Sequence, residues 1–163
     1  MIKKLLILMG TIVLIFTLKT HAQNESGDKI FTSLKELVES KAYVFHADHM
    51  LPASGPSKYL TDDYKLTIKD NKATADLPYY GEAYNVSYGG DGGIEFDNEY
   101  QEYKIEIKEK KKKILVRFKI RGDKDFYKCL LTITGKSSVT LNVQPNNRQS
   151  IQYWGDLKPL SQE

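Results

Sequence analysis

A block rich in tyrosine and glycine, residues 77–96, holds the side chains most suited to forming a binding site. It contains four tyrosines and five glycines in twenty residues. Tyrosine offers an apolar ring with one polar tip, and glycine lets a neighbouring chain approach closely. The block could form a stacking surface for a sugar, lipid or peptide at a barrel mouth, with Tyr80, Tyr84 and Tyr88 as contacts. The pattern favours the alternative, in which the tyrosines fill the core while the glycines form a bulge and a hairpin.

An acidic group, Asp91, Glu95, Asp97 and Glu99, follows these glycines. Two carboxylates facing one cleft could hydrolyse a glycosidic bond, and closely spaced carboxylates could bind calcium, although this spacing does not match the twelve-residue calcium loop. Glu95 and Asp97 also alternate with apolar residues, as the solvent-facing side chains of a strand do. The pattern favours a solvated strand surface and leaves a hydrolase of envelope glycans as the alternative function.

Two histidines and one cysteine outside the first 22 residues could also do chemistry. In a regular strand, His46 lies on the same face as Asp48 and His49 points the other way, so the two histidines cannot hold one zinc ion. His46 beside Asp48 could act as an oriented general base, but no nucleophile stands at a recognisable spacing. Cys129 is in phase with the apolar residues of its strand, which predicts a buried thiol. We expect no cofactor and no metal, and assign no catalytic residue.

Two basic features remain. The run Lys108–Lys113 contains five lysines and predicts a charged hairpin tip or, alternatively, a contact with an anionic lipid or polysaccharide surface. Arg148 precedes the last expected strand. Its guanidinium could pair with a carboxylate in Glu95–Glu99, either to stabilise the fold or to clamp a ligand.

The first 22 residues have the pattern of an export signal. Lys3 and Lys4 precede an apolar run over residues 5–18, and Ala22 supplies the small residue before a cleavage point. The run of 14 residues is shorter than the roughly 20 that a membrane span requires. We expect cleavage after this residue and a periplasmic or secreted protein.

The alternative is a retained anchor, because Lys19 follows the apolar run. No cysteine lies near the cleavage point, so a lipoprotein is excluded. Cleavage would remove three lysines from a chain with 24 Lys+Arg and 21 Asp+Glu, and the remainder would have no net charge. This balance argues against general nucleic-acid binding, which needs a basic face.

Residues 23–163 read as one domain that is mainly β. Apolar residues at helical spacing predict an amphipathic helix from Asp28 to about Lys41. After it, apolar and polar residues alternate with a period of two, which indicates strands with one buried face and therefore an antiparallel sheet. We predict a single antiparallel sandwich or partly open barrel, with the helix over one end or the open edge. The expected strands centre on residues 43–50, 64–68, 103–107, 114–120, 127–133, 139–143 and 151–153.

Several short segments also stand in a distinctive order. They are Lys41-Ala42-Tyr43-Val44-Phe45, Tyr59-Leu60, Tyr64-Lys65-Leu66, Leu77-Pro78-Tyr79-Tyr80-Gly81-Glu82-Ala83-Tyr84, Gly92-Gly93-Ile94-Glu95-Phe96, Asn147-Arg148-Gln149 and Ile151-Gln152-Tyr153-Trp154-Gly155. This order resembles the exported Bacteroidota family catalogued as domain of unknown function 4251. The resemblance implies export and a compact, mostly β domain, and it implies no established activity or catalytic residues.

These observations favour a non-enzymatic, exported β domain that binds a small ligand or another envelope protein. Tyr80, Tyr84, Tyr88 and Arg148 are the expected contacts. A glycan hydrolase is the second hypothesis, and an assembly or stress accessory without a ligand site is the third. After signal cleavage we expect no membrane span.

Overall fold

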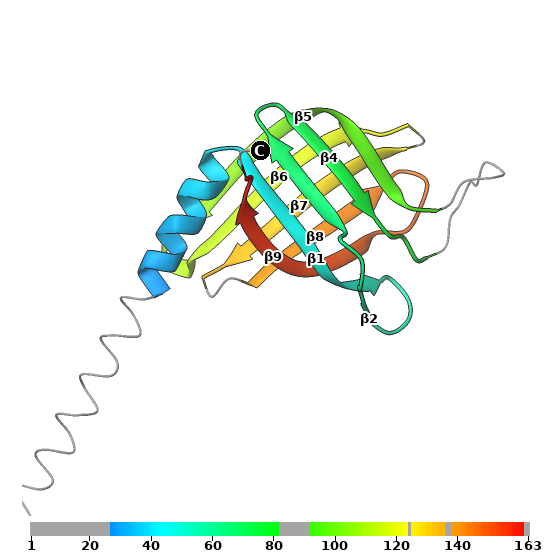
Figure 1. Ribbon diagram of the computed structural model, residues 1–163, viewed down its shortest axis with the longest axis horizontal. Helices are drawn as coiled ribbons and strands as arrows, with labels where there is room; N and C mark the ends of the chain where they lie inside the picture. The colour runs from blue at the N-terminus through cyan, green and yellow to red at the C-terminus, as the bar shows by residue number, and fades with distance from the viewer. Residues whose placement is uncertain (1–26, 82–91, 124, 136–137, 162–163) are drawn as a thin grey trace, which may run out of the picture.

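The protein folds as a mainly β structure with one α-helix among the residues that the structure, a computed structural model, describes: 27–81, 92–123, 125–135 and 138–161. Nine strands form one sheet in which all neighbours are antiparallel (Figure 1). The strands are β1 (Ala42–Pro52), β2 (Lys58–Tyr59), β3 (Lys65–Lys69), β4 (Lys72–Leu77), β5 (Ile94–Lys108), β6 (Lys113–Arg121), β7 (Phe126–Thr134), β8 (Ser138–Pro145) and β9 (Ile151–Pro159). The expected export signal, residues 1–22, lies outside the described residues.

Eight of the strands close into a barrel, which corrects the prediction of a sandwich or a partly open barrel. β1 pairs with β3 along one edge and with β9 along the other, while β2 adds a short pairing at the far end of β1. Closure requires a close approach at Gly155, where an added Cβ would overlap the carbonyl oxygen of His46. The alternation in the sequence shows which face of each strand is buried, but not that the first and last strands meet.

The interior of the barrel is packed with side chains, as the period-two alternation predicts. Tyr43, Phe45, Leu131 and Tyr153 are among its fully buried residues. Cys129 is buried with them, which confirms its predicted place in the core. Burial raises the pKa of the Cys129 thiol, because the thiolate would lose its hydration there.

The helix, described over residues 27–39, covers one end of the barrel (Figure 1). Phe31 and Val38 are buried against the core, and Lys35 Nζ lies 2.8 Å from Glu109 Oε1 at the tip of the β5–β6 hairpin. That tip is a 3-10 turn, Glu109–Lys111, so the predicted hairpin tip is confirmed. No helix among residues that the structure describes is long and apolar enough to cross a membrane.

Two strands were not anticipated. β4 places the small residues Ala73 and Ala75 inside the barrel, and such residues give only a weak alternation of hydrophobicity. β2 has two residues and forms only because β1 offers a free edge beside it. β5 is longer than expected, since it begins at Ile94 and continues through a bulge between Gln101 and Lys104.

Candidate functional site

Arg148 lies in the β8–β9 connection, at the end of the barrel away from the helix (Figure 1). Its guanidinium donates hydrogen bonds to the carbonyl oxygens of Gly92 at 2.7 Å and Gly93 at 3.1 Å, and to the Tyr127 hydroxyl at 3.3 Å. The same group stacks over Tyr79, with Cζ 4.7 Å from the ring centroid. Arg148 therefore binds backbone carbonyls, and the predicted pairing with a carboxylate in Glu95–Glu99 is wrong.

The neighbours of Arg148 extend this network. Asp125 is only 8% exposed, and its carboxylate accepts hydrogen bonds from the backbone N–H groups of Asn146 and Asn147, each at 3.2 Å. The Tyr153 hydroxyl donates to the Pro78 carbonyl at 2.6 Å. A buried carboxylate needs such donors because burial removes its water. We call the contacts of Arg148, Asp125, Tyr79 and Tyr127 the barrel-end clasp.

The predicted tyrosine platform is only partly described. Tyr80 is 57% exposed, and Lys58 Nζ lies 3.2 Å from the centroid of its ring. Tyr79, rather than Tyr80, contacts Arg148. Tyr84 and Tyr88 lie outside the described residues, so the proposed set of four contacts stays a prediction.

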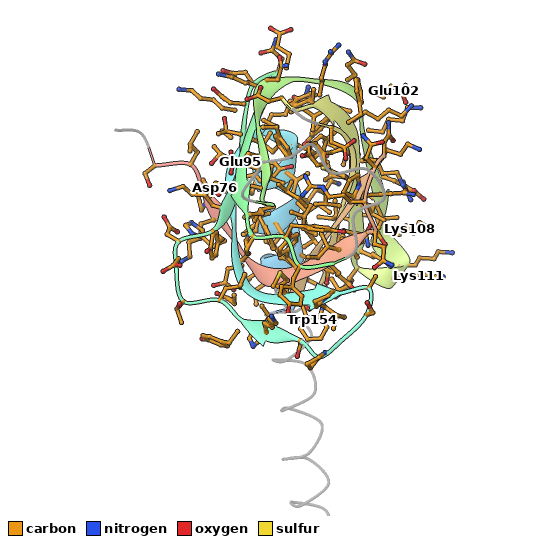
Figure 2. All side chains as sticks on the ribbon, turned by 90° about the vertical axis from the view of Figure 1, so that its right-hand side faces the viewer. Asp76, Glu95, Glu102, Lys108, Lys111 and Trp154 are labelled. Atoms are coloured by element: carbon orange, nitrogen blue, oxygen red, sulfur yellow. The ribbon has the colours of Figure 1, made fainter. Side chains whose placement is uncertain are left out.

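Three members of the acidic group, Glu95, Asp97 and Glu99, lie exposed on β5. Asp97 accepts a hydrogen bond from Thr74 Oγ1 at 2.6 Å and has Lys72 Nζ at 2.9 Å. The Thr74 hydrogen bond, and then Lys72, hold the pKa of this carboxyl below its usual range. Figure 2 shows Glu95 pointing outward on the same side as Asp76, its partner across β4 and β5. Glu95 and Asp97 are both exposed, which matches the solvated strand surface that the alternation favours. Asp91 lies outside the described residues. The hydrolase therefore stays a prediction.

A bulge in β1 changes the predicted arrangement of the two histidines. The register with β9 shifts between Ala47 and His49, so Asp48 is the extra residue. His49 consequently points to the outer face, as His46 does. The expected pair of His46 with Asp48 is replaced by a contact of His46 Nδ1 with Asp63 Oδ1 at 3.1 Å. The prediction that the histidines face opposite sides is therefore wrong.

The displaced His49 joins two aromatic residues on the outer face, Tyr59 and Trp154, which we call the aromatic row. The three residues come from β1, β2 and β9, and the strand register sets His49 opposite both of the others. Its ring centroid lies 4.6 Å from that of Tyr59 and 6.3 Å from that of Trp154. Tyr59 is 72% exposed and Trp154 43% exposed. Large rings in this position leave apolar faces open to water.

The sequence prediction missed the aromatic row. Trp154 directly follows the inward-facing Tyr153, so the period of two already places it outside. Figure 2 shows its side chain on the outside of the barrel. His49 and Tyr59 could not be found in this way, because neither the bulge nor the two-residue strand has a clear sequence signal.

Polar side chains border the aromatic row on β8 and β9. Thr140 lies opposite Trp154, and Asn142 lies opposite Gln152 in the next outward row. These hydroxyl and amide groups can donate and accept hydrogen bonds. The surface thus combines exposed ring faces with neutral hydrogen-bonding groups, which suits a ligand that has both apolar faces and hydroxyls.

Comparison with known protein families matches residues 25–157 to the family described as "Domain of unknown function (DUF4251)". Among solved structures, the fold is similar to the crystal structure of a DUF4251 family protein from Bacteroides eggerthii, with a TM-score of 0.64 and 22% sequence identity. That match covers 82% of this chain and 89% of the other. Curated proteins yielded no match.

Proposed function

The chain belongs to the family of domain of unknown function DUF4251, and we propose that it is a non-enzymatic binding domain that takes up a saccharide on the aromatic row. The expected export signal would bring it to the cell envelope or beyond. There, saccharide polymers are the natural source of such a ligand.

The observation that carries this proposal is the position of His49, Tyr59 and Trp154 side by side across three strands, with Tyr59 and Trp154 exposed and His49 partly exposed. Adjacent strands lie about 4.8 Å apart, so the row spans roughly the length of two linked pyranose rings. The C–H faces of a sugar can stack on aromatic rings, whose burial is favourable. Its hydroxyls can reach Thr140 and Gln152, which flank Trp154.

The rigid sheet supports binding rather than turnover. All three residues stand on paired strands, so little conformational freedom remains to be lost when a ligand is bound. The row offers stacking and hydrogen-bonding groups, while a hydrolase needs two carboxylates at a defined separation. This difference is why we propose binding as the function.

Trp154 is the one tryptophan in the chain, so its fluorescence reports on the row. We expect at least one of cellohexaose, laminarihexaose, mannohexaose and chitohexaose to change its emission saturably. Tyr59→Ala should weaken that binding at least tenfold, because aromatic contacts of this kind dominate binding energies. Ile30→Ala, which alters an exposed apolar residue on the helix, should leave it unchanged.

Calorimetry with the same oligosaccharides extends the test to Trp154→Ala, which lacks the fluorophore. The proposal fails if no oligosaccharide binds the wild-type protein. It also fails if folded Tyr59→Ala and Trp154→Ala both bind with unchanged affinity.

A further inference from the structure

A basic groove of about 330 Å³ lies on the outer face of β5 to β8. Four cationic side chains line it, with Glu102 as the single acidic residue of the lining. The cations are Lys104, Arg117, Lys119 and Lys128. This local excess of positive charge contrasts with the balanced charge expected for the exported chain.

The strand register sets these cations against one another. Lys104 lies directly opposite Arg117 across β5 and β6, and Lys119 lies directly opposite Lys128 across β6 and β7. Like charges in directly opposed positions destabilise a sheet. The groove therefore contains two unfavourable pairs, and a bound anion would relieve both of them.

Neighbouring carboxylates compensate only part of this charge. Lys119 Nζ lies 2.7 Å from Glu102 Oε1, and Arg117 Nη1 lies 3.0 Å from Glu106 Oε2. Neither Lys104 nor Lys128 has an ion-pair partner among the carboxylates that the structure describes. One cation of each opposed pair is thus available to an incoming anion.

The spacing of the charges indicates the form of that anion. Arg117 and Lys119 are two residues apart on β6, which corresponds to about 7 Å. Cations this far apart can each contact a separate negative group of a chain-like ligand, whereas one compact phosphate would not span them. Leu130, Asn142 and Gln144 also line the groove and add an apolar contact and two amides, which fit a hydroxyl-rich ligand.

The groove also adjoins the aromatic row. Asn142, in the groove, lies opposite Gln152, and Thr140, two residues earlier on β8, lies opposite Trp154. One extended ligand can therefore contact both surfaces. Figure 2 shows Glu102, of the groove lining, and Trp154 projecting from different parts of the outer surface, so such a ligand follows the curve of the barrel.

We infer that the groove binds the carboxylate groups of an acidic, uronate-bearing saccharide whose neighbouring ring lies on Trp154. The contact with Trp154 rests on the proposed function, whereas the charge selectivity rests on the groove alone. Lys104 and Lys128 are the residues that distinguish an acidic chain from a neutral one.

The test compares hexagalacturonate with the uncharged cellohexaose by calorimetry at low and moderate salt. We expect the acidic chain to bind at least tenfold more tightly at low salt, and salt to weaken this preference because it screens exposed charges. The double variant Lys104→Gln/Lys128→Gln should lose the preference. It should also be slightly more stable without ligand, since two repulsions are removed.

Lys69→Gln is the matched control, because Lys69 also lies opposite a lysine, Lys72, but outside the groove. It should retain the preference for the acidic chain. Equal affinity for both oligosaccharides, or an unchanged preference in the double variant, would overturn the inference. Tighter binding of single-stranded DNA or of anionic phospholipid vesicles than of hexagalacturonate would overturn it as well.

The two proposals can fail separately. If neutral oligosaccharides bind the aromatic row and the lysine substitutions change nothing, the groove inference falls and the proposed function stands. If acidic binding depends on Lys104 and Lys128 but not on Tyr59 or Trp154, the charge selectivity of the groove stands. In that case the proposed function of the aromatic row is refuted, together with the inferred contact between Trp154 and the acidic ligand.

Discussion

Arg148 and Trp154 are six residues apart in the sequence, yet they belong to regions of opposite character. The guanidinium of Arg148 is bound by Gly92, Gly93 and Tyr127 in the barrel-end clasp. The ring of Trp154 stands 43% exposed on the outer face. Of the two, Arg148 was the predicted ligand contact, whereas Trp154 was not proposed.

The difference shows that a side chain indicates a binding surface when it is exposed and not already bound within the protein, as Trp154 is. The chemical versatility of a side chain, such as the guanidinium of Arg148, is not sufficient. A guanidinium that already binds two carbonyls and a hydroxyl must give up these hydrogen bonds to hold a ligand, and their loss is unfavourable. Among the residues that the structure describes, the Trp154 indole has no hydrogen bond to give up. We therefore expect the clasp to determine stability and the aromatic row to determine binding.

Gly155→Ala should lower the stability of the fold more than any other variant, because it disturbs the pairing of β1 with β9 that closes the barrel. The added Cβ would overlap the His46 carbonyl oxygen, and overpacking of this kind costs about 3 kcal/mol. Urea denaturation would measure the loss. Gly27→Ala, where no atom lies within 4 Å of the added Cβ, should show no destabilisation. Equal stability of Gly155→Ala and the wild type would contradict the account of barrel closure.

Arg148→Ala should lower the free energy of unfolding by about 2 kcal/mol, since it removes charge-assisted hydrogen bonds to the clasp. Oligosaccharide affinity should stay within twofold of wild type once the variant is confirmed to be folded. Arg121→Ala, a control on the exposed end of β6, should change stability by no more than about 0.5 kcal/mol. A stable Arg148→Ala variant that has lost its ligand would reverse the roles assigned to the two regions.

The adjacent residues Tyr153 and Trp154 point to opposite faces of a single strand, one into the interior and one to the outer face. Tyr153→Phe removes only a hydroxyl, but that hydroxyl donates to the Pro78 carbonyl in the interior, so we expect a loss of about 1 kcal/mol with unchanged binding. Trp154→Ala removes a whole indole from the surface and should change stability by less while abolishing binding. Thermal denaturation and calorimetry on both variants test this order. A larger stability loss from Trp154→Ala would show that the indole serves the fold.

The labelling rate of Cys129 involves no substitution and tests whether the interior of the barrel stays closed to reagents in the folded protein. Because burial raises the pKa of its thiol, the reactive thiolate is not formed at pH 8 in the folded state. A thiol reagent such as dithionitrobenzoate should react only as fast as the barrel unfolds, and at a normal rate in urea. Rapid labelling of the native protein would mean that the barrel opens locally at β7.

Much of the fold could be predicted from the sequence, since the period of two identifies the buried face of each strand. It correctly placed Cys129 inside, and of the two predicted positions of the helix the structure shows the one over an end of the barrel. Closure could not be predicted, because alternation does not reveal which strand edges meet. β4 was missed because the small Ala73 and Ala75 give a weak signal.

The candidate site was harder to predict for two physical reasons. Two partners of Arg148 are backbone carbonyls more than fifty residues away, and any residue could supply them, so the sequence does not mark them. The bulge at Asp48 inverts the faces of all later residues in β1, which moved His49 to the outside. Of the aromatic row, only Trp154 could be predicted to lie on the outer face, since it directly follows the inward-facing Tyr153.

Mapping of amide chemical shifts during an oligosaccharide titration shows directly which of the two regions holds the ligand. We expect the shift changes to concentrate at His49, Tyr59 and the indole N–H of Trp154, while the signals of Arg148 and Gly93 stay unchanged. Shifts centred on Arg148 and Tyr79, with an unchanged indole signal, would contradict it.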